Sequence, residues 1–484
     1  MGQERKITKV FIANRGEIAV RIIHTCKEMD VETVVVYCPA DKGSLFTSIA
    51  DYIHEFDTND LSATYLNSKK LISIAKQFGC DAVHPGYGFL SENAQFADLC
   101  TKEGLIFIGP DSKVISLMGD KISARQKVEK LKIPLLPSVK FSEDTNLEKI
   151  KDIGFPVLIK ASAGGGGRGM RIVHNEKDLE ASIASARREA KNAFGDDTVY
   201  MEKYLEFCRH IEVQVLSDYH GNHIHLFERE CSIQRRHQKV IEEAPSSTLT
   251  QEERKLLCSA ALKITKGINY KNAGTVEFLW ENGNFYFLEM NTRLQVEHAV
   301  TEMITGIDIV KTQIQIAEGK KIPDILEKPT FKGHAIEARI YAENPKNNFL
   351  PTGGTIEHVG DCKIPNTRIE TSFVDGLNLP LEFDSMLAKV CTWSLDRNSA
   401  AKKLIQVLRN ITFTGITTNN EYLQKILKSE AFKDRKTFTN FIENFTFGSD
   451  AEVPPEVLAA VLIKLNSYTP VLEDNFHNPW LSND

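Results

Sequence analysis

Short apolar strands and helical stretches alternate over the first 110 or so residues, and no other feature of the sequence limits the fold as strongly. Apolar or β-branched runs that end in turn residues occupy residues 10–13, 33–37, 81–84 and 106–108. Helical patterns lie between them, for example at 17–27 and 68–78. This alternation predicts a doubly wound parallel sheet with helices on both faces. Ligands of such sheets bind beyond the carboxyl ends of the strands, where residues 14–17 and 84–88 lie.

The chain changes character after about residue 118, where strand pairs replace the strand–helix units. Predicted strands pair at 155–161 with 170–173, at 209–217 with 223–230, and at 275–280 with 284–290. A helix is predicted over 304–318, followed by Gly319. We therefore expect an α/β and α+β multidomain protein. Its parts are residues 1–118, 119–330, an α+β domain at 331–447, and a tail or junction segment at 448–484.

Composition excludes several classes of protein. A net charge of −6 and a pI near 6.2 give no electrostatic basis for binding nucleic acid. No stretch approaches the roughly 18 apolar residues of a transmembrane helix, and the N-terminus lacks the layout of a signal peptide. The cysteines form no CxxC pair, as expected for reduced thiols. We expect a cytoplasmic protein that binds neither nucleic acid nor membrane.

A glycine-rich loop at residues 161–169 joins two predicted strands. It contains GxGxxG, but a dinucleotide site needs a helix directly after the glycines. Between two strands, the backbone N–H groups of such a loop can cover the phosphates of a nucleotide. Lys160 stands just before the loop and supplies positive charge for those phosphates. The alternative is a hairpin that is merely flexible.

Glu277 and Glu289 are carboxylates within otherwise apolar predicted strands, where burial without a partner is costly. A magnesium ion that bridges nucleotide phosphates would satisfy both, with Asn291 as a further ligand. The alternative is that either glutamate faces solvent. A shared metal requires both on one face of the hairpin. A three-residue loop at 281–283 provides this and a two-residue turn at 282–283 does not, so we predict the three-residue register.

Polar residues occupy every second position from Glu289 to Glu297, and in an extended chain all of them point to one side. The chain must bend to bring them all to one site. Arg293 offers a planar fork for an oxyanion, and Glu297 is a candidate general base. The alternative is an exposed ribbon, because Arg and Glu are common at surfaces.

Taken together, these segments resemble the biotin carboxylase family over roughly residues 5–447. The resemblance rests on many blocks in the same order: residues 12–19, 84–93, 118–121, 161–169, 234–239, 289–297 and 337–339. It implies an ATP-grasp domain at 119–330, with a mobile lid at about 135–204 that closes over ATP. The flanking regions would be the N-terminal and C-terminal biotin carboxylase domains.

The resemblance also implies roles for individual residues. Those that would contact ATP are Lys121, Lys160, Gly165, Gly166, Glu202, Leu205, His210, Gln234, His237, Glu277 and Glu289. Glu277, Glu289 and Asn291 would hold Mg²⁺ or Mn²⁺. Bicarbonate would be bound by Lys239, Arg293, Gln295, Val296 and Glu297, and the biotin ring by Tyr87 and Arg339. The catalytic residues would be Arg293, Glu297, Lys239 and Arg339.

The implied reaction is ATP- and bicarbonate-dependent carboxylation of biotin through carboxyphosphate. Family members attach biotin to a lysine between two methionines, and no methionine here precedes a lysine. We therefore expect the biotin on a separate biotin carboxyl carrier protein, with separate carboxyltransferase subunits, and a homodimer as the family implies.

The final acceptor is predicted from two short segments. Residues 339–345 and the ending of the chain, with a helix predicted at 454–463, resemble α subunits of acyl-CoA carboxylases. They favour an acyl-CoA carboxylase, such as acetyl-CoA carboxylase, over a split pyruvate carboxylase. More remote alternatives are another ATP-grasp ligase and a non-catalytic nucleotide-binding subunit.

Overall fold

The N-terminal region folds around a five-stranded sheet in which every neighbouring pair of strands is parallel. The strand order is β3 (Tyr52–Glu55), β2 (Glu32–Tyr37), β1 (Lys9–Ile12), β4 (Ala82–His84) and β5 (Ile106–Phe107). Strand β3 was not predicted from the sequence. It lies at the edge of the sheet with mostly exposed side chains, so it lacks an apolar run.

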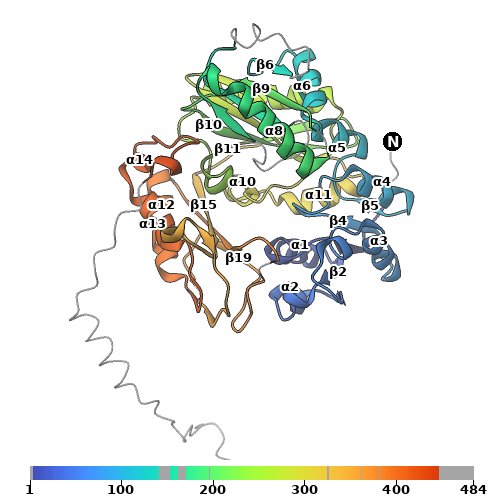
Figure 1. Cartoon of the computed structure of the whole chain (residues 1–484). Coiled ribbons are helices and arrows are strands. Elements are labelled where there is room, and N and C mark those ends of the chain that lie inside the picture. Colours follow the sequence, from blue (N-terminus) through green and yellow to red (C-terminus); the bar gives the residue numbers. More distant parts are fainter. Residues whose placement is uncertain are drawn as a thin grey trace, which may run out of the picture. The chain divides into compact units, whose positions relative to one another are not determined.

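Helices cover both faces of this sheet (Figure 1). On one face, Val10 and Ile12 pack with α1 (Gly16–Glu28). On the other, Phe11 packs with α3 (Ser68–Gln77) and α4 (Ala94–Lys102). Because side chains of a strand alternate between faces, β1 contributes to two separate cores. The predicted doubly wound fold is confirmed.

The computed structural model describes residues 4–140, 153–161, 170–195, 197–323, 326, 328–360, 362–380 and 382–445. All of them belong to one unit, Met1–Phe445. Gly165, Gly166, parts of the predicted lid and the helix predicted at 454–463 lie outside the described residues. No helix in the described part is both long and apolar enough to cross a bilayer.

An eight-stranded antiparallel sheet unites the central and C-terminal regions. Its order is β14 (Asn284–Asn291), β13 (Asn272–Glu281), β10 (Arg209–Ser217), β11 (His223–Arg235), β12 (Gln238–Ala244), β15 (His334–Tyr341), β20 (Met386–Ser394) and β19 (Thr367–Thr371). Pairing of β12 with β15 joins the two regions, and sequence reasoning did not predict it. The cavity described below takes side chains from both sides of this junction.

A smaller antiparallel sheet carries the described part of the predicted lid. Its order is β6 (Ser138–Lys140), β9 (Val199–Lys203), β7 (Val157–Ala161) and β8 (Arg171–Val173), with α8 (Leu179–Phe194) packed on it. Among the described residues, the other helices of four or more residues are α2 (Leu45–Ile49), α5 (Ser112–Gly119), α6 (Lys121–Lys130), α9 (Gln251–Gly267), α12 (Arg397–Asn410), α13 (Asn420–Lys428), α14 (Glu430–Lys433) and the pair described next.

The single helix predicted over 304–318 is wrong. Two helices, α10 (His298–Thr305) and α11 (Ile309–Ala317), occupy this part of the chain. Gly306 ends the first in the left-handed region at φ +72°, and the side chain of Asp308 caps the second by accepting from Lys311 N. Glu297 therefore stands at the N-terminal boundary of a helix that sequence reasoning placed too late.

The predicted three-residue loop between β13 and β14 is also wrong. Glu281 pairs with Asn284, so Asn282 and Gly283 form a two-residue turn with φ of +49° and +82°. A bulge then shifts the register, because Phe278 pairs with Phe287 while Glu277 pairs with Glu289. Glu277 and Glu289 consequently lie on one face of the hairpin, as predicted. The cause is the bulge at Leu288, whereas the prediction had assigned it to a three-residue loop.

The opposite face of this hairpin is apolar, and we expect Phe278→Ala to destabilise the fold by about 3–5 kcal/mol. Phe278 is fully buried and meets the rings of Phe285 and Phe287 edge to face, at centroid distances of 5.6 and 6.3 Å. Denaturant unfolding measures the loss. Phe207, which is 55% exposed, is the control, since Phe207→Ala should cost below about 1 kcal/mol. Equal losses would contradict this packing.

Candidate active site

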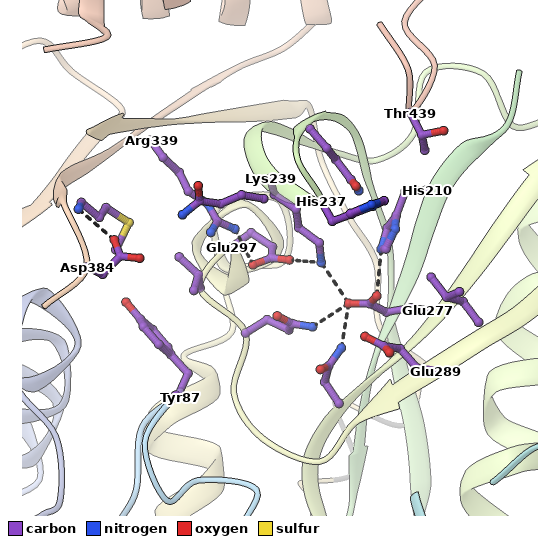
Figure 2. A pocket seen from close by; sticks show the side chains of 18 of the residues that line it. Tyr87, His210, His237, Lys239, Glu277, Glu289, Glu297, Arg339, Asp384 and Thr439 are labelled. Atoms are coloured by element: carbon purple, nitrogen blue, oxygen red, sulfur yellow. Dashed lines mark hydrogen bonds and ion pairs between the residues drawn. The ribbon is translucent and has the colours of Figure 1, made fainter. Parts of the chain in front are cut away.

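One cavity of about 820 Å³ brings together side chains from all three regions of the chain. Every predicted site residue that the structure describes lines it: Tyr87, Lys121, Lys160, Glu202, Leu205, His210, Gln234, His237, Lys239, Glu277, Glu289, Asn291, Arg293, Gln295, Val296, Glu297 and Arg339. Figure 2 shows Tyr87 and Asp384 on one side of Glu297, and His210, His237 and Thr439 on the other.

Loops at the carboxyl ends of β1 and β4 form one wall. Asn14 donates from Nδ2 to the carbonyls of Pro85 and Tyr87, at 2.8 and 2.7 Å. One buried amide thus ties the first loop to the second and fixes the backbone that carries Tyr87. This is the position at which a parallel sheet places its ligand.

Another part of the cavity lining combines lysines with apolar side chains. Lys160 is buried and pairs with Glu202. Burial lowers the pKa of Lys121, Lys160 lowers it further, and Glu289 only partly opposes them. Apolar side chains from several strands complete this end: Leu158, Met170, Ile172, Leu205, Leu279 and Leu288. An apolar slot beside cations suits a base together with phosphates.

Glu277 lies at the centre of a hydrogen-bond network. Its Oε1 accepts from Lys239 Nζ at 2.9 Å, Asn291 Nδ2 at 2.7 Å and Gln295 Nε2 at 2.9 Å, while Oε2 lies 3.1 Å from His210 Nε2 (Figure 2). Burial would raise the pKa of Glu277, but Lys239 and His210 outweigh it and hold that pKa below its usual value. The carboxylate stays ionised.

Glu289 faces Glu277 and differs from it electrostatically. Burial first, and then the Glu277 carboxylate, raise the pKa of Glu289. Two neighbouring carboxylates with the amide of Asn291 beside them are the hard oxygen donors that Mg²⁺ accepts, so these residues fit a magnesium ion. The ligand atoms of His210, Glu212 and Glu277 also lie within 4.8 Å of one another. That group fits magnesium less well, because one of its three ligands is a histidine nitrogen and Mg²⁺ prefers oxygen ligands.

Glu297 bridges the two cations of the site. Its Oε1 accepts from Lys239 Nζ at 2.6 Å and its Oε2 from Arg339 at 2.9 Å (Figure 2). Burial and Glu212 would raise the pKa of Glu297, but Lys239, Arg339 and Arg229 lower it below its usual value. Glu297 is therefore an ionised carboxylate, in the protonation state that a base requires.

Arg293 is fixed by three side-chain acceptors and by the carbonyl of Leu294, 3.2 Å from its Nη1. Its guanidinium donates to Glu92 Oε2, Gln295 Oε1 and Asn291 Oδ1, each at 3.0 Å. A planar fork held in this way presents its remaining surface in one orientation. The structure thus brings the polar series from Glu289 to Glu297 to one cavity, although Val296, expected on the other side, lines it too.

Sequence reasoning missed Glu212, Arg229 and Glu242, all fully buried. Glu212 contacts Lys239, lies 3.5 Å from His210, and pairs with Arg229. Glu242 lies 2.5 Å from Arg339. Glu212 could have been found, because it stands two residues from His210 in a predicted strand and so shares its face. Glu242 gave no comparable signal.

Comparisons with known proteins agree with this geometry. Three family models match in order: "Biotin carboxylase, N-terminal domain" over residues 6–115, "Carbamoyl-phosphate synthase L chain, ATP binding domain" over 120–325, and "Biotin carboxylase C-terminal domain" over 337–444. The second is the ATP-grasp unit. The fold and the cavity therefore define an ATP-grasp ligase with three domains.

Similar proteins specify the family. The chain is 45% identical over 449 residues to a pyruvate carboxylase subunit of Methanothermobacter thermautotrophicus, with 92% of this chain and 91% of the relative covered. It is 47% identical over 441 residues to the biotin carboxylase of Haemophilus influenzae, with 90% and 98% covered. It is 46% identical over 442 residues to the α chain of Rattus norvegicus methylcrotonoyl-CoA carboxylase, with 90% of this chain but only 62% of that relative covered.

A solved structure extends the agreement to the fold. The biotin carboxylase domain dimer of Hydrogenobacter thermophilus 2-oxoglutarate carboxylase, in complex with MgADP, ADP and bicarbonate, matches with a TM-score of 0.88 at 43% identity. The match covers 92% of this chain and all of that chain. The protein belongs to the biotin carboxylase family.

Proposed function

We propose that this protein uses ATP and bicarbonate to carboxylate biotin carried on a separate protein. The observation that supports this most strongly is the place of Glu297. Its carboxylate lies between Lys239 and Arg339, with His210 and His237 on one side and Tyr87 on the other (Figure 2). A base between a phosphate end and an acceptor end is what transfer of a carboxyl group from bicarbonate to biotin requires.

The nucleotide occupies the slot that contains Lys121, Lys160, Glu202, His210 and His237. Glu277, Glu289 and Asn291 hold magnesium, or manganese, which when bound neutralises phosphate charge. Bicarbonate lies against Lys239, Arg293, Gln295, Val296 and Glu297. The related domain dimer, which was solved with MgADP and bicarbonate, supports these three ligands.

The chemistry follows from the positions of the side chains. Glu297 takes the proton of bicarbonate, and the resulting oxyanion attacks the γ-phosphorus of ATP to form carboxyphosphate and ADP. Carboxyphosphate breaks down to CO₂ and phosphate, and the phosphate takes the proton from N1 of biotin, which attacks CO₂. Arg339 stabilises the negative charge that develops on the ureido oxygen of biotin. Exclusion of water protects the intermediate.

The direct test is bicarbonate-dependent ATP hydrolysis by the purified chain, and its stimulation by free biotin. We expect ADP formation to require both bicarbonate and Mg²⁺. ATP cleavage that needs ammonia or a carboxylic acid in place of bicarbonate would indicate another ATP-grasp ligase. ATP binding without cleavage under any of these conditions would indicate a non-catalytic subunit.

Replacement of Arg339 should separate the two halves of the reaction. We expect Arg339→Ala to lower biotin carboxylation by about 10²–10³-fold, because it removes a donor to the developing oxyanion, and to lower biotin-independent ATP cleavage much less. Carboxybiotin and ADP formation are measured in parallel. Arg235, which pairs with Glu343 at 2.6 Å and does not line the cavity, provides the control variant Arg235→Ala. An equal loss of both activities would place Arg339 at the nucleotide or bicarbonate.

For the complete enzyme we propose the first half-reaction of an acyl-CoA carboxylase, such as acetyl-CoA carboxylase. The biotin carboxyl carrier protein and the carboxyltransferase are separate subunits, and this chain is a homodimer. The similarity to the Methanothermobacter pyruvate carboxylase subunit favours pyruvate as a second candidate acceptor. Capture of partners from the native cell, followed by carboxylation assays with acetyl-CoA, propionyl-CoA, methylcrotonoyl-CoA and pyruvate, decides between them, and light scattering tests the dimer.

A further inference from the structure

Behind the cavity, the eight-stranded sheet buries two cations side by side. Arg339 of β15 lies directly opposite Lys389 of β20, and Lys389 lies directly opposite Glu370 of β19. Directly paired residues project from the same face of a sheet, and like charges in such pairs repel. Arg339 is 6% exposed and Lys389 is fully buried. Each cation therefore needs its own carboxylates.

The two cations use different carboxylates. Arg339 pairs with Glu242 and Glu297, whereas Lys389 pairs with Glu370 at 2.8 Å and with Glu17 at 3.3 Å. Burial would lower the pKa of Lys389, but Glu17, Glu370 and Glu337 raise it above its usual value. These carboxylates therefore favour the charged form of Lys389.

Lys389 also interacts with two residues of the site, although it does not itself line the cavity. Its ammonium donates a 2.7 Å hydrogen bond to the backbone carbonyl of Val296 and lies 6.0 Å from the centre of the Tyr87 ring. Val296 and Tyr87 line the cavity, but Lys389 does not. The carbonyl belongs to the peptide that links Val296 to Glu297, at the start of α10.

The carbonyl of Val296, directly before Glu297, therefore has a charged anchor, Lys389, distinct from the cations that hold the Glu297 carboxylate. Lys239 and Arg339 contact the carboxylate oxygens of Glu297, and bicarbonate, which lies against Lys239 in the proposed function, would compete with Glu297 for Lys239. In this stretch of backbone Lys389 contacts the carbonyl of Val296, which precedes the α carbon of Glu297. Its carboxylate partners, Glu17 and Glu370, come from the N-terminal and C-terminal domains. Lys389 can hold the peptide in place while the carboxylate changes partners.

We infer that Lys389 is a positioning residue, which fixes the Val296–Glu297 peptide and so keeps the Glu297 carboxylate aligned with bicarbonate. This inference rests on the proposed role of Glu297 as the base. Lys389 does not line the cavity, and we assign its effect on turnover to the position of Glu297. A shift of a reacting group by about 1 Å can cost about 10²-fold in rate, so its loss should be visible in turnover.

The test is a double-mutant cycle on bicarbonate-dependent ATP cleavage. We expect Lys389→Met to lower kcat by about 10²-fold, with KM for ATP changed by less than about threefold. In a Glu297→Gln background the same substitution should change kcat by less than about twofold, because the group it positions no longer takes a proton. A residue with a merely structural role would lower kcat by the same factor in both backgrounds, and that result would overturn the inference.

Lys271→Met is the matched control. Lys271 is also buried, donates a 2.8 Å bond to a backbone carbonyl, that of Asp218, and lies 5.8 Å from a tyrosine ring, but it does not line the cavity. We expect its kcat to stay within about threefold of wild type, and a loss equal to that of Lys389→Met would overturn the inference. If Lys389→Met does not fold, Lys389→Met/Glu370→Gln removes one charge of each sign and gives the same comparison. Wild-type protein without bicarbonate-dependent cleavage would instead refute the proposed function.

Discussion

The substitution Glu297→Gln is expected to lower bicarbonate-dependent ATP cleavage by about 10²–10⁴-fold, the usual contribution of a positioned base. The amide keeps the shape of the side chain but cannot take a proton. It also weakens the two charge-assisted bonds from Lys239 and Arg339. Nucleotide affinity should change little, because Lys121 and Lys160 contact neither oxygen of Glu297. Initial rates at saturating ATP and bicarbonate, together with calorimetric titration of ADP, measure both quantities.

The control for this substitution is Glu230→Gln. Glu230 is also a buried strand carboxylate, which pairs with Arg209 at 2.7 Å, but it does not line the cavity. The Glu230→Gln variant measures how much turnover is lost when a buried, ion-paired glutamate is neutralised outside the cavity. We expect its turnover to lie within about threefold of wild type in the fraction that folds. Turnover of Glu297→Gln within tenfold or so of wild type would exclude Glu297 as the base.

Local pattern was sufficient for most of the fold. The strand–helix alternation of the first 110 residues predicted the parallel sheet, and the range 209–217 coincides with β10. The failures have physical causes. Gly306 lies within a continuous apolar helical pattern, so the break between α10 and α11 had no signal in periodicity. The bulge at Leu288 depends on what each face of the hairpin packs against, and pairing rules for an isolated hairpin do not include this.

The site divides in a similar way. Residues that lie in one stretch, from Glu289 to Glu297, could be recognised from their spacing and from the family resemblance. Glu242 and Lys389 could not, because partners such as Arg339 and Val296 lie far away in the sequence. The alternation of side chains along a strand identifies such neighbours only after the pairing of the strands is known. The pairing of β12 with β15 was the missing step, since it places Arg339 close to Glu242.

Lys239→Met is expected to lower bicarbonate-dependent ATP cleavage by about 10²–10³-fold and also to change its pH dependence. Lys239 contacts three carboxylates, those of Glu212, Glu277 and Glu297, so its removal leaves excess negative charge where bicarbonate must bind. Lys239 also helps to lower the pKa of Glu297. Without it that pKa rises, and Glu297 becomes protonated at a higher pH than in the wild type.

The sign of the pH effect follows directly from this. A base works only when deprotonated, so the acid limb of kcat/KM for bicarbonate should move to higher pH, by about 1–3 units for the loss of an opposite charge in contact. Lys239→Arg is the matched control, because it retains the charge and should keep the limb in place even where geometry lowers the rate. Rates measured from about pH 6 to 9, at fixed total bicarbonate corrected for its own ionisation, give the position of the acid limb in the wild type and in each variant. An acid limb in Lys239→Met at the wild-type position would show that Lys239 does not control the protonation of Glu297.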